Sequence, residues 1–150
     1  MDATTKRLRA LMLGHGALVM IMGMVAGFAL TFSLLGTIEI WPFPGIAFEM
    51  PGTTRGWVAA HTGCILNGLM VVAVALALPH LELVGRARQW VAYGLITTAW
   101  ANTAFYAFGN IAPNRGLSMG ANRFGEGNLA GVLAFAPALI GAYIVIIALS

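Results

Sequence analysis

The feature that most constrains this chain is an uncharged apolar stretch over residues 56–78, about 23 residues long. A helix of that length crosses the hydrocarbon core of a bilayer, which is roughly 30 Å thick. His61, Cys64 and Asn67 interrupt the apolar run. Because a polar group in hydrocarbon is unfavourable, it usually faces the interior of a helix bundle and serves a site. The stretch therefore predicts a membrane helix that carries functional side chains.

Three further apolar stretches predict membrane helices of similar length. They cover residues 11–35, 89–109 and 129–149. Together with 56–78 they predict an all-α integral membrane protein, a four-helix bundle in one domain over residues 1–150. Only 9% of the residues are charged, whereas soluble domains average about 25%. The apolar run that follows the basic start is too long for a signal peptide, so we expect it to be retained as an anchor.

Four spans place both termini on one side of the membrane, and the distribution of basic residues indicates which side. The basic residues on the terminal side are Lys6, Arg7, Arg9, Arg86 and Arg88, and those in the opposite loops are Arg55, Arg115 and Arg123. The positive-inside rule therefore predicts that both termini are cytoplasmic. We expect no nucleic-acid partner, because no basic stripe alternates with exposed aromatic residues.

The loop between the first two spans carries Pro42, Pro44 and Pro51. Proline at that density prevents a helix. Trp41 and Phe43 in the same segment suggest a loop that lies at the membrane interface.

His61 is the residue whose side chain most clearly indicates a chemical role. A neutral imidazole is the commonest protein ligand of haem iron, and a single histidine leaves the opposite iron position open. The alternative is a histidine that hydrogen-bonds a carbonyl of a neighbouring helix. A single cysteine and the absence of a CxxCH motif exclude an internal disulfide and covalently attached c-type haem.

The neighbours of His61 on its helix point in different directions. Asn67 lies six residues on, about 240° around the helix, so it does not share the face of His61. If both are functional they serve different sides of the span; otherwise Asn67 joins two helices by a hydrogen bond. Cys64 is expected on the His61 face, either as a second soft ligand or as a small packing residue.

The third span aligns a second set of polar side chains. Asn102 and Tyr106 are spaced i, i+4 and share a face, with Thr98 one turn before them. An amide and a phenol at bilayer depth can position a ligand that contains oxygen, or they can form a polar seam against the second span. His15 enters the membrane from the opposite side to His61. The two differ in depth by roughly 15 Å, so they make a poor pair of haem ligands within one chain.

The last loop is rich in glycine and asparagine, which suit left-handed turns. Its Arg115 and Arg123 could bind carboxylates such as haem propionates, or they could be solvated loop arginines.

Four segments of the sequence are distinctive in combination. They are GHG at residues 14–16, HTGCILNG within PGTTRGWVAAHTGCILNGLMVVAVAL, the run WANTAFYAFGNIAPNRGLSMGANRFGEGN, and AFAPA near residue 135. Together they resemble the styrene oxide isomerase family over nearly the whole chain. The chain departs from the family pattern at Thr98, where relatives carry an acidic residue, and in lacking a basic tail after the fourth span.

The resemblance implies a homotrimer of four-helix subunits in the bacterial inner membrane, with haem b between neighbouring subunits. It implies that His61 is the axial iron ligand and that Asn67 and Tyr106 line the substrate side. The implied reaction is a Meinwald rearrangement of styrene oxide to phenylacetaldehyde. Ferric haem would act as a Lewis acid, a 1,2-hydride shift would follow, and no external redox partner would be needed.

Two other functional classes compete with this interpretation. A membrane haem subunit for electron transfer would normally need two histidines at matching depth, which the spacing argues against. A small transporter would use His61, Asn67 and Tyr106 to line a path, but no inverted repeat and no carboxylate in the spans supports it.

Overall fold

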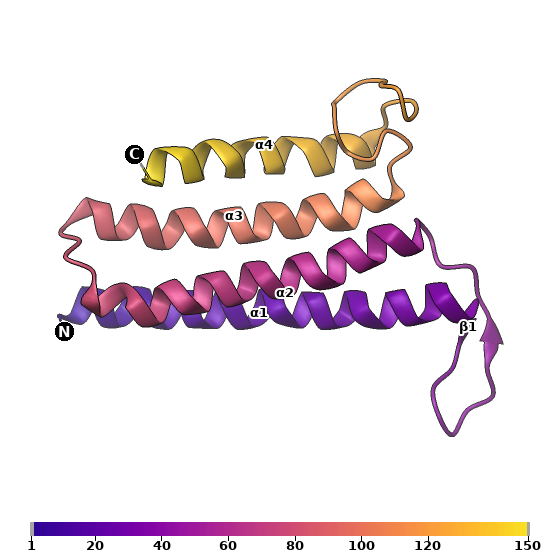
Figure 1. Ribbon diagram of the computed structural model, residues 1–150, viewed down its shortest axis with the longest axis horizontal. Coiled ribbons are helices and arrows are strands. Elements are labelled where there is room, and N and C mark those ends of the chain that lie inside the picture. The colour runs from indigo at the N-terminus through magenta and orange to yellow at the C-terminus, as the bar shows by residue number, and fades with distance from the viewer. Residues whose placement is uncertain (1, 150) are drawn as a thin grey trace.

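The computed structural model describes residues 2–149, and in that part of the chain four long helices run side by side (Figure 1). They are α1 (Ala3–Leu35), α2 (Thr54–Ala77), α3 (Arg86–Ile111) and α4 (Leu129–Leu149), and a short 3-10 turn, η1 (Leu78–His80), follows α2. The predicted all-α, four-helix architecture is confirmed. The two ends of the chain lie at the same end of the bundle, as four spans require. Which side of the membrane they face remains a prediction.

The described helices have the dimensions and surfaces of membrane spans. Three of them, α1, α2 with its 3-10 turn, and α4, are each long and apolar enough to cross a bilayer. Helix α3 carries more polar side chains, but its 26 residues extend about 39 Å and run beside the others. Large apolar side chains point outward, among them Phe28 and Ile147, which are 64% and 62% exposed. The chain is therefore a multi-pass membrane protein.

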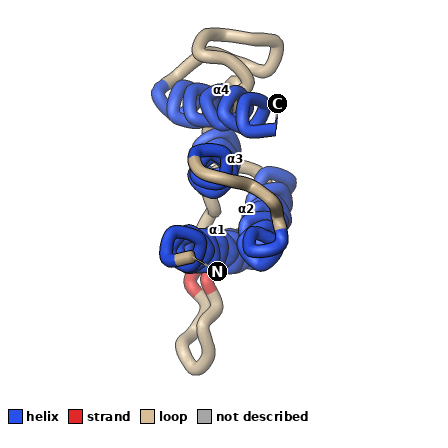
Figure 2. The backbone as a smooth tube through the Cα atoms, turned by 90° about the vertical axis from the view of Figure 1, so that its left-hand side faces the viewer, coloured by secondary structure: helices blue, strands red, loops and turns tan. Residues whose placement is uncertain are grey.

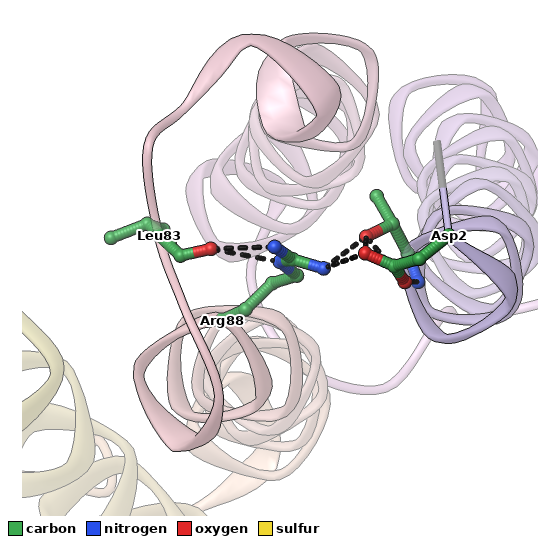
Figure 3. A network of polar contacts seen from close by, with 4 residues as sticks. Asp2, Leu83 and Arg88 are labelled. Atoms are coloured by element: carbon green, nitrogen blue, oxygen red, sulfur yellow. Dashed lines mark hydrogen bonds and ion pairs between the residues drawn. The ribbon is translucent and has the colours of Figure 1, made fainter.

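Helix α1 begins eight residues before the predicted span because a polar network holds its first turn. The Asp2 carboxylate accepts a hydrogen bond from the Thr5 backbone N–H at 2.7 Å and forms an ion pair with Arg88 at 2.7 Å. Arg88 also donates to the Leu83 carbonyl and the Thr5 hydroxyl (Figure 3). The Thr5 N–H and the Arg88 guanidinium hold the pKa of Asp2 well below its ordinary value. The network joins the start of α1 to the start of α3.

The proline-rich connection between α1 and α2 forms a small β-hairpin. Gly36 ends α1 in the left-handed region with φ 67°. Strands β1 (Thr37–Ile38) and β2 (Ile46–Ala47) then pair antiparallel. Figures 1 and 2 show that the hairpin projects sideways beyond α1, at the level of the helix ends. Trp41 is 92% exposed at its tip, as expected of a segment at the membrane interface.

Small residues set how closely the helices approach. A Cβ added to Gly16 would lie 2.9 Å from the Gly68 carbonyl oxygen, and one added to Gly141 would lie 2.9 Å from Ala101 Cβ. Such close crossings are typical of helices that pack in lipid. Helices α1 and α2 form one pair and α3 and α4 another, and α3 joins the two pairs. Viewed along the helices, α4 lies on the far side of α3 from α1 and α2 (Figure 2).

Candidate functional site

His61 lies on the side of α2 that faces α1. Its Nδ1 is 2.8 Å from the Gly23 carbonyl oxygen, and the ring rests over Gly27, where an added Cβ would be 2.8 Å from Nδ1. Gly23 and Gly27, which have the spacing of a GxxxG motif, therefore pack against α2 within the chain. A carbonyl oxygen only accepts, so Nδ1 carries the proton and Nε2 keeps its lone pair. Within residues 2–149, Nε2 has no hydrogen-bond partner.

The hydrogen bond to a neighbouring helix is thus present, and it is compatible with metal binding. Histidines that ligate a metal through one ring nitrogen usually donate the other N–H to a carbonyl or carboxylate, which fixes the tautomer and the ring orientation. Among the described residues no group of three or more His, Cys, Asp or Glu side chains could hold a metal ion. A metal at His61 would therefore have to bring its remaining ligands with it, as iron in a porphyrin does. The donor set fits haem.

Cys64 does not share the surroundings of His61, so the expectation of a common face was wrong. Its Sγ is buried and lies 3.7 Å from the Thr103 hydroxyl of α3. Three residues turn a helix by about 300°, and the remaining 60° is enough to direct Cys64 toward α3 instead of α1. Cys64 is a packing residue, not a second ligand.

A polar cluster joins α2 and α3 one to two turns along from His61. The Asn67 amide donates to the Gly63 carbonyl at 2.7 Å and accepts from Asn102 Nδ2 at 2.9 Å. The Tyr106 ring lies directly on Gly63, where an added Cβ would be 2.4 Å from Cε2 and Cζ. In the described part of the chain the Tyr106 hydroxyl has no hydrogen-bond partner. The structure therefore brings Asn67, Asn102 and Tyr106 together at Gly63.

Thr98 does not belong to this cluster, although its spacing placed it on the same face. Its hydroxyl is buried and donates to the Gly141 carbonyl of α4 at 3.1 Å. Each step of four residues drifts by about 40° around a helix, and α4 offers the hydroxyl a carbonyl that α2 does not. Thr98 therefore ties α3 to α4.

The predicted separation of the polar residues around and along the helices is confirmed. His61 contacts α1, whereas Asn67 contacts α3. His15 accepts from the Trp100 indole N–H at 3.1 Å. His61 is level with Gly23, eight residues beyond His15 on α1, which corresponds to about 12 Å of depth. The two histidines cannot ligate one iron within a chain.

The loop arginines gather around one aromatic ring. The guanidinium carbons of Arg115 and Arg123 lie 4.1 and 4.6 Å from the centroid of Phe124. Both arginines are exposed. Their loop connects the ends of α3 and α4 and lies on the α4 side of the chain (Figure 1). His61 instead contacts the Gly23 carbonyl of α1, and α1 lies on the opposite side of α3 from α4 (Figure 2). One chain therefore does not bring these arginines to its own His61.

The model of the styrene oxide isomerase family matches residues 8–150. The chain belongs to the styrene oxide isomerase family. It is also similar to a protein of Pseudomonas fluorescens named styrene-oxide isomerase, with 42% identity over 129 residues, 86% of this chain and 76% of that protein. The resemblance drawn from its motifs is confirmed, and the chain is an isomerase.

Two asparagines that shape this member of the styrene oxide isomerase family were not among the predicted site residues. Asn110 accepts from the Thr53 N–H and hydroxyl at 2.9 and 3.0 Å and so fixes the start of α2, about two turns before His61. Asn114 is completely buried, donates to the carbonyls of Ser118 and Gly120, and accepts from the Gly116 N–H. The only local signal for either role is an asparagine near a helix end or a glycine.

Proposed function

We propose that this chain converts styrene oxide to phenylacetaldehyde in a bacterial inner membrane, using haem b bound to His61. The supporting observation is the His61 ring, which has one nitrogen committed to the Gly23 carbonyl and the other left with a lone pair. That arrangement would let His61 hold the haem through this second nitrogen, as metal-binding histidines commonly do. When bound, ferric haem supplies a Lewis acid to the epoxide oxygen.

The polar cluster at Gly63 supplies the remaining polar contacts. The Tyr106 hydroxyl is unpartnered within residues 2–149, and Asn67 retains one N–H after donating to Gly63. Both can donate to the oxygen as negative charge grows on it during cleavage of the benzylic C–O bond. They also hold the substrate so that hydride moves from the terminal carbon to the benzylic carbon, which leaves the aldehyde. No electron enters or leaves, so no redox partner is required.

In this proposal, the apolar surroundings of the membrane site favour the reaction. Opening at the benzylic carbon leaves a cation that water would trap as a diol, so the pocket must exclude water. The Asn67–Asn102 and Tyr106–Gly63 contacts lie between apolar helices with outward-facing hydrophobic side chains. The same surroundings concentrate an apolar epoxide.

We further propose that the site is completed between subunits of a homotrimer. His61 contacts α1, whereas Asn67 and the Tyr106 ring meet on the side of α2 that faces α3. The loop of Arg115 and Arg123 lies on the α4 side of the chain (Figure 1). A neighbouring copy would bring its Asn67 and Tyr106 to the substrate at His61, and its Arg115 and Arg123 could bind the carboxylates of the haem.

The test compares His61→Ala with His80→Ala in purified protein. His80 is exposed in η1, so its removal should leave haem content and turnover unchanged. His61→Ala should lose both, measured by the Soret band, pyridine haemochrome assay and chromatography of phenylacetaldehyde without added reductant. Co-expression of His61→Ala and Tyr106→Phe chains should restore activity if sites form between copies. A haem-free His61→Ala protein that turns over like wild type would refute the proposal.

A further inference from the structure

We propose that Asn102 is a positioning residue that holds the Asn67 amide with its N–H toward the substrate oxygen. The inference rests on the proposed function and deepens it, because it assigns a residue outside the set of His61, Asn67 and Tyr106. Its basis is the 2.9 Å hydrogen bond from Asn102 Nδ2 to Asn67 Oδ1, which joins α3 to α2.

The orientation of both amides follows from one backbone carbonyl. The Gly63 carbonyl can only accept, so the Asn67 atom 2.7 Å from it must be Nδ2. The Asn67 oxygen then points toward α3, where its partner must be a donor. Asn102 therefore presents Nδ2 to Asn67, and its own Oδ1 has no hydrogen-bond partner among residues 2–149. A chain of two hydrogen bonds thus fixes two side chains that could each otherwise flip.

This arrangement makes Asn67 a donor toward any ligand. One of its N–H groups is taken by Gly63 and its oxygen by Asn102, so the second N–H is what remains. Without Asn102, the Asn67 oxygen would lose its partner in a half-buried site and could turn toward the substrate. An amide oxygen beside the epoxide oxygen would repel it as negative charge develops. Asn102 prevents that orientation.

The cluster also explains why Asn102 acts next to Tyr106. The two residues are one turn apart on α3, and their partners Asn67 and Gly63 are one turn apart on α2. The Tyr106 ring and the Asn67 amide both lie against Gly63. The same turn of α2 therefore positions both the Tyr106 hydroxyl and the Asn67 N–H.

The test uses Asn102→Leu, which keeps the branched shape of the side chain and removes the donor, with the smaller Asn102→Ala as a second variant. Thr97→Ala is the matched control, because Thr97 is exposed on the same helix and has no hydrogen-bond partner within residues 2–149. Both Asn102 variants should lower kcat per bound haem about tenfold while KM changes less than about twofold, because the substrate still binds but is misoriented. Thr97→Ala should match wild type.

A double-mutant cycle separates positioning from a purely structural role. In an Asn67→Ala background, Asn102→Leu should cause no further loss of kcat. A loss of the same size in both backgrounds would overturn the inference, as would wild-type kcat per haem in both Asn102 variants. The proposed function fails differently: wild-type protein would then not isomerise styrene oxide, or His61→Ala would retain full activity.

Discussion

Substituting Gly63 by alanine tests the central contact of the site. An added Cβ would lie 2.4 Å from Cε2 and Cζ of Tyr106 and 2.7 Å from its hydroxyl oxygen. Carbon atoms in contact are normally about 3.5–4.0 Å apart. The ring must therefore withdraw by more than about 1 Å, and the hydroxyl moves with it.

The size of the effect follows from that displacement. Misplacing a reacting group by about 1 Å can reduce turnover about 100-fold, which corresponds to about 2.7 kcal/mol of activation free energy. Forcing an extra methyl group into a packed interior also destabilises the fold by about 1–3 kcal/mol. We therefore expect Gly63→Ala to keep its haem, because His61 faces α1, but to lose about two orders of magnitude in kcat.

The assay combines initial rates of phenylacetaldehyde formation, haem content and thermal unfolding in detergent. Gly14→Ala is the matched control, since a Cβ added to Gly14 meets nothing within 4 Å. In a helix that change should stabilise the protein by about 0.5–1 kcal/mol and leave turnover unchanged. A Gly63→Ala protein with the kcat and Tm of wild type would show that Tyr106 does not rest on Gly63.

Two further predictions concern His61 and the terminal network. Gly27→Ala places a Cβ 2.8 Å from His61 Nδ1 and should displace the ring from the Gly23 carbonyl. We therefore expect haem binding to weaken about 10–100-fold, measured by titrating the apo-protein with haem. A titration curve identical to that of wild type would contradict the prediction. Asp2→Asn should lower the Tm at pH 7, because the charge that pairs with Arg88 is lost. Because folding lowers the pKa of Asp2, the stabilisation is complete above the ordinary carboxyl pKa of about 3.9 and declines as the pH falls below it. The Tm difference between wild type and Asp2→Asn should therefore narrow from pH 7 toward pH 3, and a difference independent of pH would refute the assignment.

Features that depend on distance along a helix were predictable from the sequence. The separation in depth of His15 and His61 follows from the rise per residue, and the different faces of His61 and Asn67 follow from the turn per residue. Both agree with the contacts of these side chains. Helical geometry alone could not decide whether Asn67 joins two helices or belongs to the site, because that depends on which side chains of α3 face Asn67.

Features that depend on the neighbouring helix were missed. Cys64 and Thr98 stand within about 60° of the predicted faces, yet they contact α3 and α4, where a hydroxyl and a carbonyl are within reach. The ion pair of Asp2 with Arg88 joins residues 86 positions apart, and no local pattern encodes it. The stacking of Arg115 and Arg123 on Phe124 likewise arises from a loop that Asn114 folds on itself.

The amino-acid sequence alone determined the membrane class, the helical spans and the angular position of His61, because hydrophobic length and helical period are local properties of the chain. Tertiary structure decided which nitrogen of His61 donates to the Gly23 carbonyl and which hydrogen bonds Asn67 makes. The reason is physical: a side chain's hydrogen bonds depend on the backbone carbonyls and amides of the helix packed against it, and that packing is set by small residues such as Gly23 and Gly63 on facing helices.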